Sequence, residues 1–171
     1  MWNEQIIMML LEGIKDTLYM TLTSTLIGYV IGLPMGILLT VTDKDGIHPN
    51  TAVYKVLDVI ANLIRSVPFL ILLIVLIPFT RFLIGRSYGP TATIVPLVIA
   101  AAPYIARMVE SSLKEVDAGV IEAARSMGAS NFTIVTKVML VEARTSLIVG
   151  ATISLLSLIH ISEPTRPRLI S

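Results

Sequence analysis

The stretch from Thr17 to Thr42 reads TLYMTLTSTLIGYVIGLPMGILLTVT and contains no charged residue. A helix of about 20 apolar residues crosses the hydrocarbon core of a bilayer, which is roughly 30 Å thick. Charged residues stand on both sides of this stretch, at positions 12–16 and 43–45. We therefore predict a first membrane-spanning helix here.

The composition of the whole chain agrees with a membrane location and with lipid as the surrounding medium. Of the 171 residues, 54% are hydrophobic and 15% are charged, whereas about 25% are charged in a typical soluble domain. The formal net charge of +1 gives no reason to expect nucleic acid as a partner. The chain has no cysteine, and its two histidines, His48 and His160, lie far apart, so we expect neither a metal site nor a cofactor.

Three further charge-free stretches follow the first one. Residues 66–80 are short for a crossing, so we expect that helix to begin before Arg65. Residues 87–106 form the next stretch, which Arg107 and Glu110 end, and residues 145–159 form the last, which falls below the usual spanning length. The fold class predicted is all-α, a polytopic membrane bundle with three full spans and a fourth that is cut short.

Two ionisable residues fall close to membrane depth, Asp58 and Arg65, seven positions apart on one helical face. Charged residues inside a span can mark a proton relay. They can also anchor a helix end by extending toward the membrane interface. We favour interface anchoring for both.

Gly28, Gly32 and Gly36 recur every fourth residue within the first span. Small residues at this spacing let two membrane helices approach closely. The spacing predicts packing against a neighbouring helix of the same chain, and a dimer-forming face is the alternative.

Lysine and arginine residues indicate the orientation of the chain in the membrane. The segments 43–65 and 107–144 carry eight of them, and the opposite side carries three, Lys15, Arg81 and Arg86. Because cytoplasmic loops are enriched in these residues, both segments should be cytoplasmic and the N-terminus should lie outside.

The polar segment 107–144 contains two predicted helices. One runs from Gly119 to Met127, with Asp117 as its N-cap and Gly128 as its stop, and a second begins near Ser130. The first helix carries Glu122-Ala123-Ala124, which is followed after three residues by Gly128 and after nine more by Val138-Met139-Leu140.

This pattern resembles the E-A-A signature of the permease subunits of bacterial ABC importers. In that family the segment is a cytoplasmic coupling helix that docks on the ATP-hydrolysing subunit. The resemblance implies a coupling role for a set of seven residues: Gly119, Glu122, Ala123, Ala124, Met127, Gly128 and Ala129. The sequence departs from the signature at Val141, where the family usually has proline, and an ordinary amphipathic surface helix is the alternative reading.

The resemblance extends from residue 13 to residue 158, and Arg65-Ser66-Val67-Pro68-Phe69 and Ala101-Ala102-Pro103-Tyr104 are similar to the methionine-import branch of the family. It implies a type I importer transmembrane domain at 13–158, with the last helices of the family absent. It also implies a location in the bacterial inner membrane, a homodimer, two partner ATPase subunits and a methionine-binding lipoprotein. Residues 159–171 depart from the family, and we expect a polar tail foreign to the natural protein, with a genuine short C-terminus as the alternative.

The chain lacks the phosphate-loop pattern GxxxxGK[ST] and the hydrolase patterns HExxH and GxSxG, so we expect no enzymatic activity of its own. The function predicted is that of a permease for methionine or a related amino acid, driven by ATP hydrolysis on a partner. A secondary transporter or channel, and a truncated fragment without function, are the alternatives.

Overall fold

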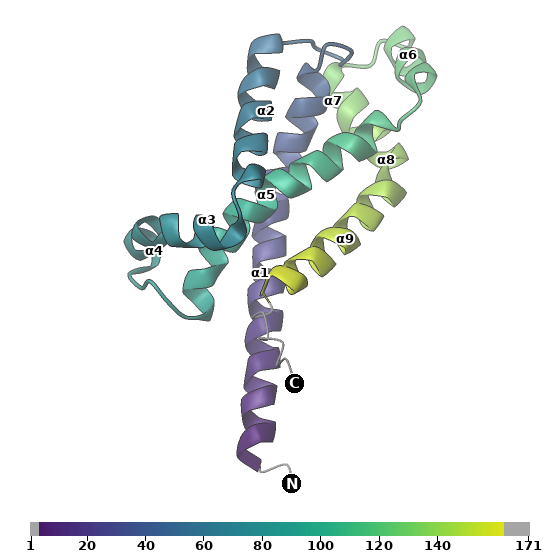
Figure 1. Cartoon of the computed structure of the whole chain (residues 1–171). Coiled ribbons are helices and arrows are strands. Elements are labelled where there is room, and N and C mark those ends of the chain that lie inside the picture. Colours follow the sequence, from purple (N-terminus) through teal and green to yellow (C-terminus); the bar gives the residue numbers. More distant parts are fainter. Residues whose placement is uncertain (1–3, 163–171) are drawn as a thin grey trace, which may run out of the picture.

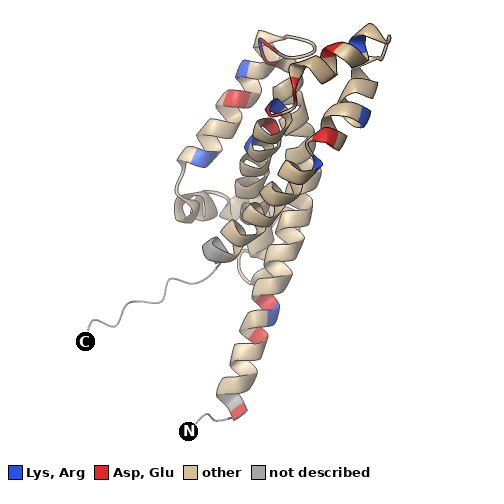
Figure 2. Ribbon diagram, turned by 90° about the vertical axis from the view of Figure 1, so that its right-hand side faces the viewer, with Lys and Arg blue, Asp and Glu red and all other residues tan. Residues whose placement is uncertain are grey.

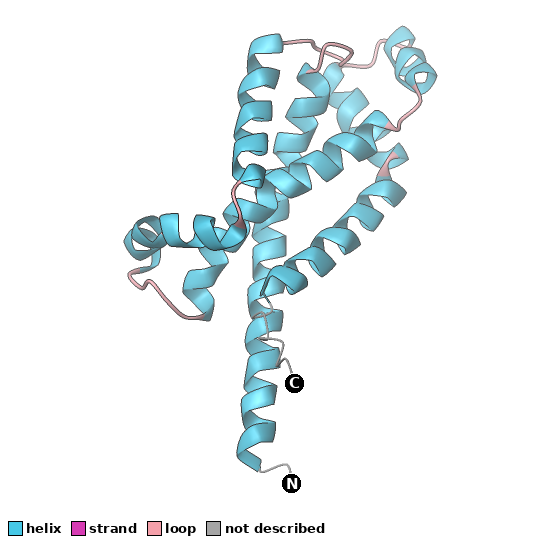
Figure 3. Ribbon diagram, in the orientation of Figure 1, coloured by secondary structure: helices cyan, strands magenta, loops and turns pink. Residues whose placement is uncertain are grey.

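The computed structural model describes residues 4–162 of the chain, and every regular element in that range is a helix (Figure 3). The order along the chain is α1 (Glu4–Thr42), α2 (Thr51–Ser66), α3 (Phe69–Val75), α4 (Ile77–Ile84), α5 (Pro90–Lys114), α6 (Ala118–Ser126), α7 (Asn131–Thr133), the π-helical turn η1 (Ile134–Met139), α8 (Leu140–Glu142) and α9 (Arg144–Ser162).

Helix α1 is the longest element and extends well beyond the rest of the bundle at its N-terminal end (Figure 1). At 1.5 Å per residue its 39 residues measure about 58 Å, more than a bilayer core requires. The charged residues at 12–16, which we expected to mark a helix end, lie inside this helix. The predicted first span is confirmed, because residues 6–42 are long and apolar enough to cross a membrane.

Helix α5 is the centre of the bundle and the second helix among residues 4–162 that could cross a membrane alone. It packs along α1, and the residue numbers of the contacting residues increase in the same direction along both helices. Gly28 faces Ala101 and Ile105, and Gly36 faces Ala106 and Val109. The two helices are therefore parallel, so they cross the membrane in the same direction and the chain must return once between them.

The glycine stripe of α1 provides this contact. A Cβ atom added to Gly32 would lie 2.7 Å from the Ala102 carbonyl oxygen, and one added to Gly36 would lie 2.6 Å from that of Ala106. Only a residue without a side chain lets the backbones approach this far. The stripe is thus filled by α5 of the same chain, and Gly28, Gly32 and Gly36 are all buried there.

The return between α1 and α5 is a broken span, which differs from the single helix that we expected over residues 66–80. Helices α2 and α3 meet at an angle of 103°. Proline restricts the preceding residue to extended backbone and has no N–H to donate. Val67 is accordingly extended, with φ −84° and ψ 125°, and α2 ends at Ser66. The absence of charge therefore does not make residues 66–80 one helix, because Pro68 interrupts them.

The second bent pair leads into the last helix. Residues 131–142 and 144–159 are inclined by 70° to one another, and each pair of bent helices could be one span. Helix α9 continues to Ser162, so the first four residues of the expected polar tail are helical. The rest of that tail, residues 163–171, lies outside the described residues. Helix α5 likewise continues past Arg107 and Glu110 to Lys114, beyond the end that we predicted.

Charged residues gather mainly at the end of the bundle opposite the N-terminus, and a smaller group lies in the N-terminal part of α1 (Figure 2). The segment 43–50 and helix α6 share that charged end (Figure 1). This placement puts the segment 43–50 and helix α6 on one side, as the count of lysine and arginine predicts, whereas Arg65 lies at the other end of α2.

Candidate functional site

Helix α6 projects at the charged end and has well-defined boundaries. The Asp117 side chain accepts a hydrogen bond of 2.7 Å from the Gly119 backbone N–H, which caps the helix start. Gly128 follows the helix with φ +79°, a conformation that costs a glycine little. Ser130 then caps the next helix by accepting from the Thr133 N–H at 3.3 Å. Both predicted helices and their boundary residues are present within one residue of the expected positions.

The seven residues with an expected coupling role fall into two groups. Gly119, Glu122, Ala123, Met127 and Gly128 are exposed, and Met127 has 82% of its surface accessible. Ala124 is only 5% exposed and joins the buried core, and Ala129 is half-buried. The small size of Ala124 therefore serves packing within this chain, whereas Ala123 faces outward beside Glu122.

Helix α6 is held above a cavity of about 610 Å³ that separates it from the loop after α1. The Arg125 guanidinium crosses the rim and donates to the Ile47 carbonyl oxygen at 3.2 Å. Glu122 and Arg125 line the cavity on one side, and residues 43–47 line it on the other. The contact joins the two basic segments of the sequence.

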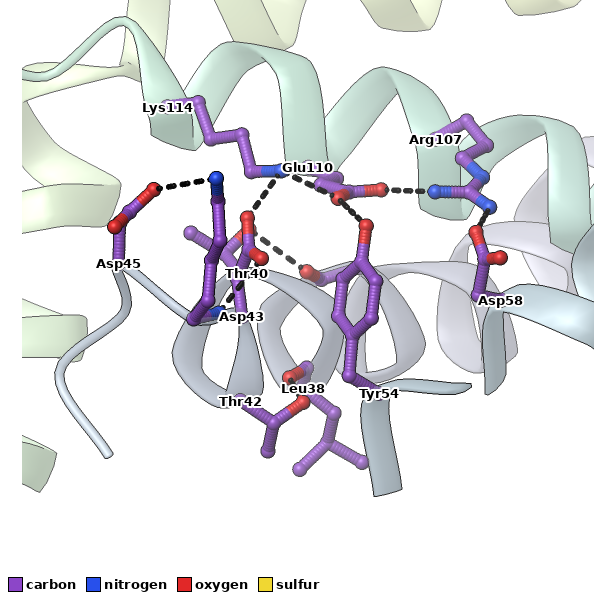
Figure 4. Close-up of polar contacts among 12 residues, drawn as sticks. Leu38, Thr40, Thr42, Asp43, Asp45, Tyr54, Asp58, Arg107, Glu110 and Lys114 are labelled. Carbon is purple, nitrogen blue, oxygen red and sulfur yellow. Dashed lines mark hydrogen bonds and ion pairs between the residues drawn. The ribbon is translucent and has the colours of Figure 1, made fainter. Parts of the chain in front are cut away.

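An ionic cluster borders this cavity and connects α5 to α2 and to Asp43, the residue that follows α1 (Figure 4). Glu110, which is 5% exposed, accepts from the Arg107 Nη1 atom at 2.7 Å and from the Lys114 Nζ atom at 2.8 Å. Arg107 also pairs with Asp58, and Lys114 pairs with Asp43 at 2.7 Å. Because each charge has an opposite charge beside it, the cluster can be tolerated at the edge of the membrane.

Tyr54 completes this cluster from α2. Its hydroxyl lies 3.4 Å from the Glu110 Oε1 atom, and the Lys114 ammonium lies 5.9 Å from the centre of its ring. At the exposed edge, the Lys114 ammonium donates a hydrogen bond that holds the pKa of the Asp43 carboxyl below its ordinary value of 3.8. Asp43 thus remains charged as the link between α1 and α5.

This cluster corrects the interpretation of Asp58 as an interface anchor. Its carboxylate pairs with Arg107, which is 49 residues away in the chain, so its role is tertiary. Arg65 is exposed, and among residues 4–162 it makes no ion pair. One signal was available in the sequence. Arg107, Glu110 and Lys114 follow one another at spacings of three and four, which places them on one face of a helix.

The profile of the family described as "Binding-protein-dependent transport system inner membrane component" matches residues 7–162. The chain belongs to this family. It is therefore a multi-pass component of the inner membrane and the permease part of an ABC importer, and the predictions of an all-helical membrane bundle and of a transport component that is not an enzyme are confirmed.

Several individual relatives agree with this assignment. The D-methionine transport system permease protein MetI of Salmonella typhimurium is 48% identical over 160 residues, which are 94% of this chain and 74% of the relative. MetI of Escherichia coli has the same identity and coverage. A probable MetI of Pasteurella multocida is 50% identical over 147 residues, which are 86% of this chain and 68% of the relative.

Solved structures show the same fold. A chain of the MetNI methionine ABC transporter in an inward-facing conformation superposes with a TM-score of 0.91 at 48% identity, over 94% of this chain and 74% of that one. An amino acid ABC transporter, crystallised with histidines, superposes with a TM-score of 0.70 at 22% identity, over 92% of this chain and 72% of that one. The second likeness concerns the fold alone.

Proposed function

We propose that this permease imports methionine, in the D or L form, or a closely related amino acid. The observation that carries the proposal is the identity of 48% with proteins named as D-methionine permeases, over nearly all of this chain. The structural similarity to a methionine ABC transporter, with a TM-score of 0.91, also supports this proposal. The partners proposed are an ATPase homodimer, a methionine-binding lipoprotein and a second copy of this chain.

We further propose that α6 is the segment that transmits ATP hydrolysis to the spans, with Gly119, Glu122, Ala123, Met127 and Gly128 facing the ATPase and Ala124 and Ala129 supporting them. The exposure of the first group and its position at the charged end support this role. On this assignment the charged end is cytoplasmic, and the N-terminus of α1 lies outside the cell. The glycine stripe 28, 32 and 36 is assigned to packing of α1 on α5.

The first test reconstitutes the permease with its ATPase and lipoprotein in vesicles and measures methionine uptake and ATP hydrolysis together. Glu122→Lys should leave ATP hydrolysis running while uptake falls about tenfold or more, because a reversed charge on the docking face costs on the order of 1.4 kcal/mol or above. Glu12→Lys is the matched control, since Glu12 is also exposed but lies on the first turns of α1. Normal coupling in Glu122→Lys would contradict the role of α6.

A second test uses two glycines with the same backbone strain. Gly128 and Gly85 have φ values of +79° and +78°, and a Cβ atom would meet nothing within 4 Å at either. Alanine should therefore cost about 1 kcal/mol of stability at both positions. Only Gly128→Ala should lower the ratio of methionine imported to ATP hydrolysed, because only Gly128 ends α6. Equal ratios in the two variants would show that this turn does not matter for coupling.

A further inference from the structure

A second cavity, of about 410 Å³, opens where the broken span meets α5 and α9. It lies at the junction of α2 and α3, where Val67 and Pro68 interrupt the helix. Membrane transporters often form their substrate sites at discontinuous helices, because the interruption exposes side chains and backbone groups inside the bundle. Its volume falls within the range of about 300–1,000 Å³ that is usual for sites of small ligands.

The wall of this cavity has two chemical characters. Phe69, Leu72 and Ile105 give it an apolar part, and Arg65, Tyr104 and Ser157 give it polar groups. An apolar wall with few polar groups suits a small molecule that has a charged head and an apolar side chain. A lipid-facing surface would have no need of the guanidinium.

Arg65 is the group that indicates the charge of the ligand. The arginine of the ionic cluster, Arg107, is paired with Asp58 and Glu110, whereas Arg65 makes no ion pair in the part of the chain that the structure describes. Ionisable residues close to membrane-spanning segments often belong to functional sites. The planar guanidinium matches a carboxylate with two parallel hydrogen bonds.

We propose that this cavity binds the transported amino acid, with its carboxylate on Arg65 and its side chain against Phe69, Leu72 and Ile105. This inference rests on the proposed function of the chain as an amino-acid importer. The hydroxyls of Tyr104 and Ser157 face the remaining polar atoms of the zwitterion. The site thus accepts an unbranched apolar side chain such as that of methionine.

The absence of cysteine from this chain allows a direct test in the complete transporter. Ser157→Cys gives the permease a single thiol in the cavity wall, and its modification by N-ethylmaleimide is followed on the permease band. Methionine in either enantiomeric form should slow the modification, and the amine analogue of methionine that lacks the carboxylate should not. Lys55→Cys, on the exposed face of α2 and outside the cavity, is the matched control and should react at the same rate with and without methionine.

Arg65 and Leu72 test the two halves of the proposal. In the Ser157→Cys background, Arg65→Gln should raise the methionine concentration for half protection on the order of tenfold to a hundredfold, as the loss of a charge-assisted hydrogen bond does. Arg65→Lys should give an intermediate shift. Leu72→Trp should remove protection by filling the cavity, whereas Ile74→Trp, on the exposed side of the same helix, should not. Co-purification with the ATPase shows that each variant is assembled.

The outcomes separate this inference from the proposed function. If the unmodified complex imports methionine but methionine leaves the Ser157→Cys reaction unchanged, the cavity is not the site and the proposed function stands. Half protection at the same concentration in Arg65→Gln and the parent would also overturn the assignment of the carboxylate. If the unmodified complex imports no methionine, the proposed substrate is wrong, and the occupant named here is wrong with it.

Discussion

The two ends of α2 are built in opposite ways. In its first half, Tyr54 and Asp58 are tied to α5, because the Tyr54 hydroxyl contacts Glu110 and the Asp58 carboxylate pairs with Arg107. At its other end the helix stops at Ser66 and borders a cavity, and Arg65 stands there unpaired among the described residues. The comparison indicates that the paired end holds three helices together, whereas the broken end leaves volume and one free charge for a ligand.

The largest expected effect comes from the paired end. Glu110→Gln removes the carboxylate shared by Arg107 and Lys114, and breaking a buried ion pair costs about 3 kcal/mol. The variant should show a clear loss of thermal stability in detergent. Asp45→Asn is the matched control, because the Lys44–Asp45 pair has both side chains 83% exposed and should contribute less than about 1 kcal/mol. Equal losses would show that the cluster does not stabilise the bundle.

A smaller effect is expected from the close contact between α1 and α5. Gly36→Ala would place a methyl group 2.6 Å from the Ala106 carbonyl oxygen, and overpacking of this kind costs about 1–3 kcal/mol. Gly13→Ala, in open space on the same helix, should be neutral or stabilise α1 by up to about 1 kcal/mol. Thermal unfolding of both variants checks the difference, and a neutral Gly36→Ala would mean that α1 and α5 are not in close contact.

The smallest expected effect is a loss of stability at low pH. Lys114 lowers the pKa of Asp43 in the folded protein below its value of 3.8 in the unfolded chain, so the ion pair stabilises the fold above that pH. This contribution should be lost as the pH falls from 3.8 through the lower pKa of the folded state. It should be below about 1 kcal/mol, because the Lys114 side chain is 43% exposed. Asp43→Asn should flatten the acid limb of the stability curve measured by thermal unfolding, and an unchanged acid limb would contradict the role of this ion pair.

Local features were predictable from the sequence, whereas the partners of most tertiary contacts were not. The cap at Asp117 and the turn at Gly128 depend on a few adjacent residues, so their positions could be stated in advance. The first span could be read from its length and lack of charge alone. The break at Pro68 depends on backbone conformation, which a count of charges does not describe.

The partners of the charged residues could not be found in this way. Asp58 and Arg107 are separated by 49 positions, and Arg125 and Ile47 by 78, so nothing local relates the members of each pair. The same holds for the cavity, since Arg65, Tyr104 and Ser157 come from three separate helices. Residues that meet only through helix packing carry no joint signal in one sequence.

The parallel contact between α1 and α5 also fixes the register of these two helices relative to each other. Gly36 lies against Val109, and Asp43, seven residues later, lies against Lys114. The glycine stripe and the ion pair therefore both depend on the same alignment of α1 with α5. Deleting a single residue between them would turn Asp43 by about 100° around the helix axis and shift it by about 1.5 Å, so the carboxylate would leave Lys114 even though no charge had been removed.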